Sequence, residues 1–584
     1  MPKTKIVATL GPASEDRKTI RQLIEAGMDV ARLNFSHGTH DEHKKKMENV
    51  KELEKEVGKP VGIMLDTKGP EIRIGELENG EVELTKGNKV ILTPKNIKGD
   101  SSRISTNYRD LSDYVKPGSI VLLDDGLIEL KVLQINGKEI ECTVMTSGNL
   151  TEKKSLNLPG VSVELPGLTE KDKEDIKFGI KNGIHFIAAS FVRNAENVIE
   201  IRQLLEEEWA DGIKIIAKIE SEEAVRNVDE IIEVSDGIMI ARGDLGVETP
   251  PEKVPVIQKM IIEKCNEAAI PVITATQMLN SMIHNPRPTR AESSDVANAI
   301  YDGTDATMLS GESAIGSYPV KAVEMMDQIA CEVENSPSYK KSINEYRKNQ
   351  LETVTEAISY TSYRTATDLG AEAIITATGS GYTARMVSKY RPLIPVIAVT
   401  PNEMVQHTLS LTWGISPLLV GQSTSTDEMV DNSVNAALES GLVQDGALVT
   451  ITAGVPVGIP GTTNLIRVQV VGDPLIEGQG VGKGIVSGKV VFAKTADEAI
   501  EKIKEDDILV TRMTNEQFLP AMEKAAAVIT AEGGITSHSA VVGLKLGMPV
   551  VSNSGQVFKL LKEDELVTVD GVRGLVYRGK ANIK

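Results

Sequence analysis

The chain has 584 residues and a formal net charge of −19 at pH 7, with 64 Lys and Arg against 83 Asp and Glu. This length exceeds what one hydrophobic core usually serves, so three or four domains are expected. The acidic balance argues against a general nucleic-acid binder. Every apolar run is shorter than the ~18 residues of a membrane span, and the N-terminal run is too short for a signal peptide. Three cysteines without CxxC spacing fit reduced thiols, so we expect a cytoplasmic protein.

Eight short apolar runs alternate with helical patterns over the first 335 residues. This alternation is typical of parallel βα units, and eight such strands close a (β/α)8 TIM barrel. Most runs turn polar at their ends, where the active-site mouth of such a barrel lies. The polar residues at these ends are Thr9, Arg32, Asn34, Asp66, Ser190, Lys218, Glu220, Arg242, Asp244, Thr276 and Glu312.

The rest of the sequence predicts three further domains of α/β or β type. The insertion between the third and fourth strands is rich in β patterns and turns, which predicts a small β-barrel lid over the mouth. A glycine-rich run at 472–484 fails the P-loop spacing and is interpreted as a flexible connection. The predicted domains are a barrel at 1–69 and 170–340, a lid at 70–169, an open α/β domain at 353–475 and a β/α swivelling-type tail at 478–584.

Two carboxylates at neighbouring strand ends predict a divalent-cation site. Glu220 and Asp244 suit Mg2+, which keeps waters for its substrate; ion pairs with Lys218 or Arg242 are the structural alternative. Strand alternation directs Lys218 and Glu220 to the same side, because they are two residues apart. A lysine there would neutralise a phosphoryl group or a developing enolate. The N–H groups near Gly243, at the start of a helix, would hold a carboxylate or phosphate.

Oxygen-bearing residues after the second and third strands offer a second cation site. Asn34 and Ser36, with Asp66 and the carbonyl of Thr67, suit a larger monovalent cation, although ordinary polar packing has the same composition. Nearby, "HGTHDEH" contains three histidines, but their spacing is not that of a closed zinc site. The letters "THDE" instead predict a helix capped by Thr39.

These residues lie in motifs that resemble the pyruvate kinase family over about residues 1–475. The motifs include "ARLNFSHG", "LDTKGPEIR", "IIAKIES", "SDGIMIARGDLGVE", "VITATQML", "PRPTRAESSDVANAI" and "MLSGESA". The family transfers phosphate from phosphoenolpyruvate to ADP, giving pyruvate and ATP, in the last step of glycolysis. The resemblance therefore implies an allosterically regulated homotetramer that depends on Mg2+ and K+.

The resemblance also implies individual roles. Lys218 is expected to stabilise the transition state, and Thr276 to protonate the enolate directly or through water. Glu71 matches the K+-dependent form of the family. The implied ligands of Mg2+ are Glu220 and Asp244, and those of K+ are Asn34, Ser36, Asp66 and Thr67. The implied substrate-binding residues are Arg32, Gly243, Asp244 and Thr276. The implied nucleotide-binding residues are Asn34, Phe35, Ser36, His37, Arg73 and Lys154.

A small-residue loop in the α/β domain predicts a regulatory site. "TATGSGYTA" has a G-x-G-x-x-A outline between a strand and a helix, in the domain that holds the family's effector site. The hydroxyls of Thr378, Ser380 and Thr383, with backbone amides such as that of Gly381, would bind a phosphate. The loop lacks the basic residues that favour sugar bisphosphates in some members, which favours AMP or a sugar monophosphate.

The tail contains "GGITSHSA", which resembles the phosphohistidine swivelling domain of phosphoenolpyruvate synthases and pyruvate phosphate dikinases. There, the residue matching His538 carries phosphate, so a phosphohistidine phosphotransferase is one competing function. The chain offers no segment for the nucleotide-grasp domain that exchanges phosphate with such a carrier, which favours a structural or regulatory tail. Two more functions stay open at this point, a Mg2+-dependent aldolase or lyase on a related barrel and a nonenzymatic effector-binding protein.

Overall fold

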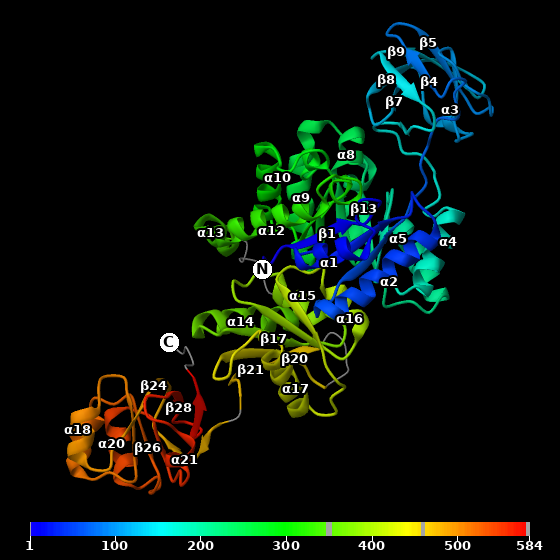
Figure 1. Ribbon diagram of the computed structural model, residues 1–584. Helices are drawn as coiled ribbons and strands as arrows, with labels where there is room; N and C mark the ends of the chain where they lie inside the picture. Colours follow the sequence, from blue (N-terminus) through cyan, green and yellow to red (C-terminus); the bar gives the residue numbers. More distant parts are fainter. Residues whose placement is uncertain (1, 346–352, 457–461, 473, 580–584) are drawn as a thin grey trace. The chain divides into compact units, whose positions relative to one another are not determined.

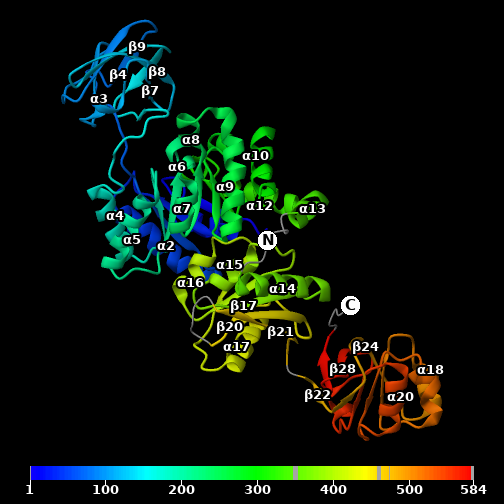
Figure 2. The ribbon, with the colours of Figure 1, turned by 180° about the vertical axis from the view of Figure 1, so that it is seen from behind.

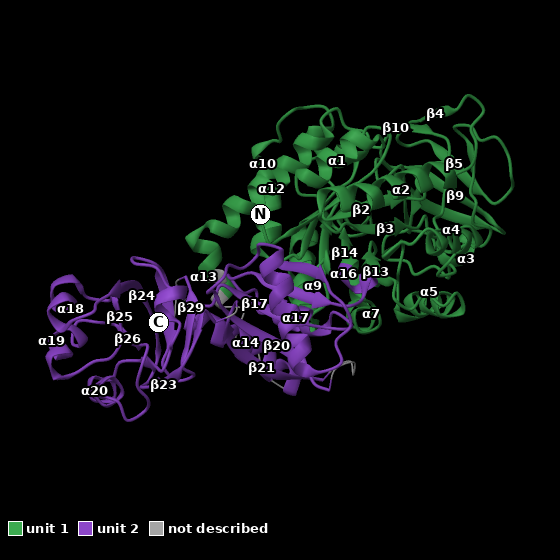
Figure 3. Cartoon of the chain, turned by 60° about the horizontal axis from the view of Figure 1, so that its bottom comes forward, with its two compact units in different colours: residues 1–345, 407–414 green, residues 346–406, 415–584 purple. Residues whose placement is uncertain are grey.

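The computed structural model describes residues 2–345, 353–456, 462–472 and 474–579. The chain forms two compact units (Figure 3), one of residues 1–345 with 407–414 and the other of residues 346–406 with 415–584. Within the described residues, no helix combines the length and apolar character that crossing a membrane requires.

Eight parallel strands form the predicted closed barrel, in the neighbour order β1-β16-β15-β14-β13-β12-β3-β2. Helices follow the strands along the chain and lie around them (Figures 1 and 2). The strands are β1 (Lys5–Thr9), β2 (Val30–Asn34), β3 (Gly62–Asp66), β12 (Phe186–Ala189), β13 (Lys214–Ile219), β14 (Gly237–Ala241), β15 (Val272–Ala275) and β16 (Ala306–Leu309). The helices are α1 (Arg17–Glu25), α2 (His40–Val57), α4 (Glu170–Lys181), α5 (Ala195–Glu207), α6 (Glu222–Arg226), α7 (Val228–Val234), α8 (Arg242–Glu248), α9 (Val254–Ala268), α10 (Arg290–Tyr301), α11 (Gly311–Ala314), α12 (Pro319–Asn335) and α13 (Pro337–Glu345).

The start of α2 confirms the predicted cap. The side chain of Thr39 accepts the N–H of Glu42, and the side chain of Glu42 accepts the N–H of Thr39. This reciprocal pair satisfies donors that the first turn of a helix leaves without partners. The histidine-rich sequence therefore begins a helix.

A segment from the α/β part of the sequence completes the barrel interior. Leu411 is fully buried in one cluster with Val7, Phe186 and other apolar side chains of the strands. The N–H of Trp413 donates to Oδ1 of Asp305 at 3.2 Å. Burial of a leucine and a tryptophan makes residues 407–414 part of the barrel core rather than a surface loop.

The lid strands form two sheets. The six-stranded sheet has the order β11-β7-β8-β9-β5-β6, and β4 pairs with β10 in the other. Both sheets lie within the insertion at 70–169, in which the sequence predicts a β-rich lid. The elements are β4 (Glu81–Leu84), β5 (Lys89–Thr93), β6 (Arg103–Ser105), α3 (Leu111–Tyr114), β7 (Ile120–Leu123), β8 (Ile128–Asn136), β9 (Glu139–Val144), β10 (Gly148–Thr151) and β11 (Leu156–Asn157).

The second unit begins with an open five-stranded sheet in the order β19-β18-β17-β20-β21. Its strands are parallel except β21, which is an antiparallel strand at one edge of the sheet. This arrangement matches the predicted open α/β fold. The elements are α14 (Val354–Leu369), β17 (Ala373–Ala377), α15 (Tyr382–Ser388), β18 (Val396–Thr400), α16 (Glu403–Leu409), β19 (Ile415–Leu419), α17 (Thr426–Glu439), β20 (Leu448–Gly454) and β21 (Thr463–Val470).

The tail is built on an eight-stranded sheet in the order β22-β29-β28-β24-β25-β26-β27-β23. Residues 580–584 of the predicted tail lie outside the described residues. The elements are β22 (Ile476–Glu477), β23 (Gln479–Val481), β24 (Ile485–Phe492), α18 (Ala496–Lys502), β25 (Ile508–Thr511), α19 (Leu519–Met522), β26 (Ala527–Thr530), α20 (His538–Leu546), β27 (Val550–Ser552), α21 (Val557–Leu560), β28 (Leu566–Asp570) and β29 (Leu575–Arg578).

The interpretation of 472–484 as a flexible connection is wrong for its central part. Residues 476–481 form β22 and β23, which pair with β29 and β27 at the two edges of the tail sheet. A Cβ on Gly478 would lie 2.6 Å from the carbonyl oxygen of Ser552, and one on Gly480 would collide with the backbone of Gly574. These glycines therefore permit close backbone packing, a need that composition does not distinguish from flexibility.

Replacing Leu411 with Ala should lower the free energy of unfolding of the barrel unit by about 2–5 kcal/mol, because a cavity would remain among the strands. Trp413 is 1% exposed and Trp209 is 93% exposed. Urea unfolding can therefore be followed by the emission of Trp413 in a Trp209→Phe background.

The matched control is Leu133→Ala, at a residue that is 39% exposed in the lid. Its effect should stay within about 0.5 kcal/mol, because little apolar area is lost. Equal effects of the two substitutions would show that Leu411 is not a core residue.

Candidate active site

Charged side chains from three strand ends meet at the mouth of the barrel. Nε of Arg32 donates to Oδ2 of Asp66 at 2.6 Å, and Nη1 of Arg32 donates to Oγ1 of Thr9 at 2.9 Å. Nζ of Lys218 lies 3.2 Å from Oδ1 of Asp66 and 3.0 Å from Oε1 of Glu220. Arg32, Asp66, Lys218 and Glu220 are all buried and constitute what we call the charge cluster.

The charges of the cluster control the ionisation of its members. Burial opposes charge on Asp66, but Arg32 and Lys218 outweigh it and hold the pKa of this carboxyl below its ordinary value. Burial also opposes charge on Lys218, yet Asp66 and Glu220 hold the pKa of the ammonium above its ordinary value. Lys218 is therefore a permanent cation at neutral pH, held by its two carboxylate partners.

Ser190 is a member of the site to which the sequence pattern gives no role. Nζ of Lys218 donates to Oγ of Ser190 at 2.8 Å, and Oγ of Ser190 donates to the carbonyl oxygen of Thr67 at 2.6 Å. The serine thus fixes the third direction of the lysine ammonium. Its position at the end of the fourth barrel strand is the available signal, but a lone serine has too many ordinary uses to carry a role.

Glu220 and Asp244 fit a divalent cation. Burial raises the pKa of Glu220 to about 6 and also raises the pKa of Asp244, although Lys218 opposes both shifts. Among the described residues, no group of three or more His, Cys, Asp or Glu is arranged around a metal position. The charge of Lys218 does not offset the burial of these two carboxylates. Such a pair suits Mg2+, which takes its remaining ligands from water and substrate.

The residues predicted for K+ lie on two adjacent strand ends. Asn34 pairs with Asp66 in the register of β2 and β3. Oδ1 of Asn34 accepts the N–H of Ser36 at 3.0 Å, and the carbonyl of Thr67 accepts the hydroxyl of Ser190. Amide, carboxylate, hydroxyl and carbonyl oxygens are thus brought close in the fold, and oxygen donors of this kind suit a hard cation.

Thr276 lies beside the start of α8. The N–H of Gly243 donates to Oγ1 of Thr276 at 2.7 Å, and this hydroxyl donates to the carbonyl oxygen of Ala275 at 2.6 Å. Gly243 and Asp244 belong to the first turn of α8, where backbone N–H groups lack helical partners. The hydroxyl and the helix start are therefore joined at one side of the mouth.

The residues predicted to contact a nucleotide differ in exposure. The ring of Phe35 is buried and stacks on a histidine of α2 with 4.0 Å between centroids, whereas His37 is exposed. Arg73 pairs with Glu71 at 2.6 Å, and Lys154 pairs with an aspartate of the β7–β8 turn at 2.8 Å. The two cations have 39% and 41% exposed side chains, so they remain open to an anionic ligand.

The lid turn between β7 and β8 lies against helix α8, which carries Asp244. A Cβ added to Gly126 would lie 3.6 Å from Cγ1 of Val247. Burial is the main cause that raises the pKa of Asp244, and the positive charge of Lys218 opposes this rise. The negative charge of Asp125 raises the pKa further. The lid thus brings acidic charge to the carboxylates of the mouth.

Comparison with known proteins identifies the family. The profile described as "Pyruvate kinase, barrel domain" matches residues 1–323, and "Pyruvate kinase, alpha/beta domain" matches residues 356–469. The chain belongs to the pyruvate kinase family. As a pyruvate kinase, it is a phosphotransferase.

Relatives cover the whole chain. A pyruvate kinase from Geobacillus stearothermophilus is 54% identical over 583 residues, which make up 100% of this chain and 99% of that protein. One from Bacillus licheniformis is 53% identical over 585 residues and 100% of both chains. The crystal structure of a pyruvate kinase from Cryptosporidium parvum has a TM-score of 0.76 and 42% identity, covering 81% of this chain and 96% of its own.

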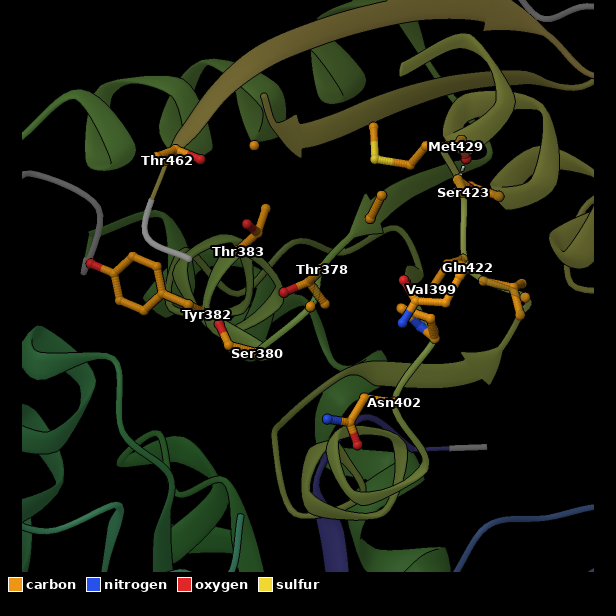
Figure 4. A pocket seen from close by; sticks show the side chains of 17 residues that line it. Thr378, Ser380, Tyr382, Thr383, Val399, Asn402, Gln422, Ser423, Met429 and Thr462 are labelled. Atoms are coloured by element: carbon orange, nitrogen blue, oxygen red, sulfur yellow. Dashed lines mark hydrogen bonds between the residues drawn. The ribbon is translucent and has the colours of Figure 1, made fainter. Parts of the chain in front are cut away.

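The α/β domain of the chain contains a pocket at the loop after β17 (Figure 4). Thr378, Ser380 and Thr383 line the pocket, together with Asn402 from the start of α16. Oγ1 of Thr378 accepts the N–H of Gly381 at 2.9 Å, which holds the loop. Oγ1 of Thr383 lies 2.7 Å from the hydroxyl oxygen of a threonine on β21, so this side chain is already paired within the protein. None of the described lining residues is basic.

The tail matches a third profile, "PEP-utilising enzyme, mobile domain", over residues 503–574. His538 is the first residue of α20 and is half-buried. Its Nδ1 lies 2.9 Å from Oγ1 of Thr514. The hydrogen bond orients the ring through Nδ1 and directs Nε2 away from this contact.

Removing the ammonium from the charge cluster should destabilise the protein in a pH-dependent manner. Lys218→Met leaves Asp66 and Glu220 buried without their shared cation, which costs about 3–5 kcal/mol of unfolding free energy. Burial already raises the pKa of Glu220, and the variant removes the ammonium that opposes this rise. A carboxyl with a raised folded pKa makes a contribution to stability that is lost as pH rises. The variant should therefore be destabilised more at about pH 8 than at about pH 5.

Urea unfolding of variant and parent at the two pH values measures this difference. Lys177→Met is the matched control, because Lys177 pairs with Glu208 at 2.9 Å on the exposed surface. That substitution should shift neither midpoint. A destabilisation by Lys218→Met that does not change with pH would contradict the assigned charge cluster.

Proposed function

We propose that the barrel mouth transfers the phosphoryl group of phosphoenolpyruvate to ADP and releases pyruvate and ATP. The observation that carries this proposal is the charge cluster, in which buried Lys218 lies within 3.2 Å of both Asp66 and Glu220. A permanent cation beside two metal-binding carboxylates is what stabilisation of a migrating phosphoryl group requires. Relatives named pyruvate kinase over the full chain support the same reaction.

Glu220 and Asp244 would hold Mg2+, and Asn34, Ser36, Asp66 and Thr67 would hold K+. When bound, these cations neutralise phosphate charge and align the reacting oxygens. Their proposed ligands include two carboxylates whose pKa values are raised by burial, which a bound cation would relieve. Glu71, the residue of the K+-dependent form, is itself desolvated, since burial raises its pKa against the charge of Arg73.

The side chains of the mouth would divide the remaining work. Arg32, held by Asp66 and Thr9, presents its guanidinium to the phosphoryl group, while Lys218 offsets charge on the oxygen that becomes the enolate. Thr276 would deliver a proton to the enolate carbon, directly or through water. Backbone N–H groups at Gly243 and Asp244 would bind the substrate carboxylate. The exposed cations Arg73 and Lys154 would bind the nucleotide phosphates.

The α/β pocket would bind a phosphorylated effector. Its hydroxyl-rich, nonbasic lining favours a single phosphate group, as in AMP or a sugar monophosphate, over a bisphosphate that needs more positive charge. We further propose a cytoplasmic homotetramer, as the family resemblance implies. In this arrangement the tail serves a structural or regulatory purpose, because the barrel already holds a complete set of phosphoryl-transfer residues.

Turnover should require a monovalent cation. In a coupled assay of pyruvate formation with Mg2+ at constant ionic strength, K+ should raise kcat at least about tenfold over tetramethylammonium, a difference of ~1.4 kcal/mol in activation free energy. Glu71→Lys should reduce this dependence, because its ammonium places a positive charge near the cation site. Equal turnover without any monovalent cation would refute the K+ proposal.

His538→Ala should leave transfer from phosphoenolpyruvate to ADP within about twofold of the parent, since the barrel residues are intact. Lys218→Met should abolish most of the same activity. Incubation with phosphoenolpyruvate labelled in its phosphate should give no acid-labile label on the tail. A label that is present in the parent and lost in His538→Ala would instead support the phosphohistidine phosphotransferase.

A further inference from the structure

We infer that Arg242 is a positioning residue for the proton-transfer step, which it supports by holding the backbone of Thr276, and that Asp295 fixes Arg242 for this purpose. The inference rests on the proposed function, because it takes Thr276 as the proton donor to the enolate. The sequence pattern gives Asp295 no role and indicates Arg242 only as an ion-pair partner for the carboxylates.

The guanidinium of Arg242 is occupied on two sides. Nη2 donates to the carbonyl oxygen of Thr276 at 2.8 Å, and Nε donates to that of Ala275 at 3.2 Å. Nη1 and Nη2 also donate to the two carboxylate oxygens of Asp295, each at 2.7 Å. The side chain of Arg242 is 12% exposed. A bidentate pair, here with an arginine side chain largely shielded from solvent, fixes the plane of the guanidinium and thus the direction of its other donors.

The backbone that Arg242 holds is strained. Thr276 has φ +69° and Gln277 has φ +56°, both in the left-handed region. A β-branched residue rarely adopts this region, because its side chain crowds the backbone there. Strained conformations of this kind persist only when surrounding contacts over-determine them. The carbonyls of Ala275 and Thr276, at the point of strain, are the groups that Arg242 binds.

This strain determines where the hydroxyl of Thr276 lies. In the observed conformation, Oγ1 of Thr276 accepts the N–H of Gly243 at 2.7 Å. Gly243 directly follows Arg242. One residue pair therefore ties β15 to the start of α8 by side chain and by backbone. Asp295 anchors the pair to α10, an element outside the mouth. If the hydrogen bonds from Arg242 to the carbonyls of Ala275 and Thr276 are lost, the backbone at Thr276 can relax. The hydroxyl of Thr276 then moves away from the N–H of Gly243.

The defining measurement is exchange of the pyruvate methyl protons with D2O, followed by proton NMR with Mg2+, K+ and inorganic phosphate. Arg242→Lys keeps the charge but cannot form the bidentate pair. It should slow the exchange at least about tenfold, as expected for a misplaced catalytic group. ATP formed in the first turnover, measured by rapid quench, should keep its parental rate because phosphoryl transfer precedes protonation.

The matched control is Arg202→Lys. Arg202 also pairs with an aspartate and a backbone carbonyl: its Nη2 donates to Asp236 at 2.9 Å and to the oxygen of Val234 at 3.0 Å. It does so on α5, away from the strand ends of the mouth. Exchange in this variant should remain within about twofold of the parent. Equal behaviour of the two variants, or a parallel loss of first-turnover ATP in Arg242→Lys, would overturn the positioning role.

Two further variants test whether the effect of Arg242 runs through the strained backbone and through Asp295. Gln277→Gly relieves left-handed strain at an exposed side chain, so Arg242→Lys/Gln277→Gly should recover a large part of the lost exchange. Absence of recovery would show that the defect does not come from relaxation of the strained backbone and would overturn the inference. Asp295→Asn should slow exchange by itself yet add little to Arg242→Lys, because it acts through the same guanidinium; additive losses would contradict this order.

Thr276→Ala distinguishes failure of this inference from failure of the proposed role of Thr276. If Thr276→Ala exchanges pyruvate protons at the parental rate, Thr276 is not the donor and the proposed function is wrong at that step. If Thr276→Ala is slow and Arg242→Lys is not, the proposed function stands and the positioning role is overturned. Slow exchange in both variants, with rescue by Gln277→Gly, supports both.

Discussion

A buried lysine held between two carboxylates is the interaction on which the catalytic part of the structure depends. Lys218 is charged because Asp66 and Glu220 outweigh the cost of its burial, and Asp66 is charged because Arg32 shares it. Each ion in such a group is expensive to bury alone and tolerable only with its partners. The charge cluster therefore commits strands β2, β3 and β13 to one relative placement.

The topology of the barrel provides this placement of β2, β3 and β13. Parallel strands end at one face, so residues far apart in the chain deliver side chains to the same mouth. Apolar residues fill the interior below the mouth. They include Leu411, from a segment of the first unit whose neighbours in the chain belong to the second unit. The polar ends of the strands thus form the site, and their apolar starts pack the interior.

The α/β pocket and the tail have a different physical make-up from the mouth. The α/β pocket offers hydroxyls and backbone groups in a loop, with two of its threonine hydroxyls already paired inside the protein. His538 lies in the first turn of a helix and is oriented by Thr514; within the described part of the chain it has no charged partner comparable to those of Lys218. Similarity of the tail to the mobile domain of PEP-utilising enzymes indicates its fold and does not by itself establish its chemistry.

Much of this protein was determined by local sequence pattern. The eight strands, the cap at Thr39 and the two carboxylates after β13 and β14 follow from periodicity and turn chemistry, which act over a few residues. The family follows from the resemblance of short motifs. Only the tertiary structure decided which groups meet across strands. Ser190 against Lys218, Asp295 against Arg242, and Leu411 inside the barrel depend on register and chain crossing. The close packing at Gly478 shows the same limit, because a glycine in the sequence does not reveal whether it serves motion or contact.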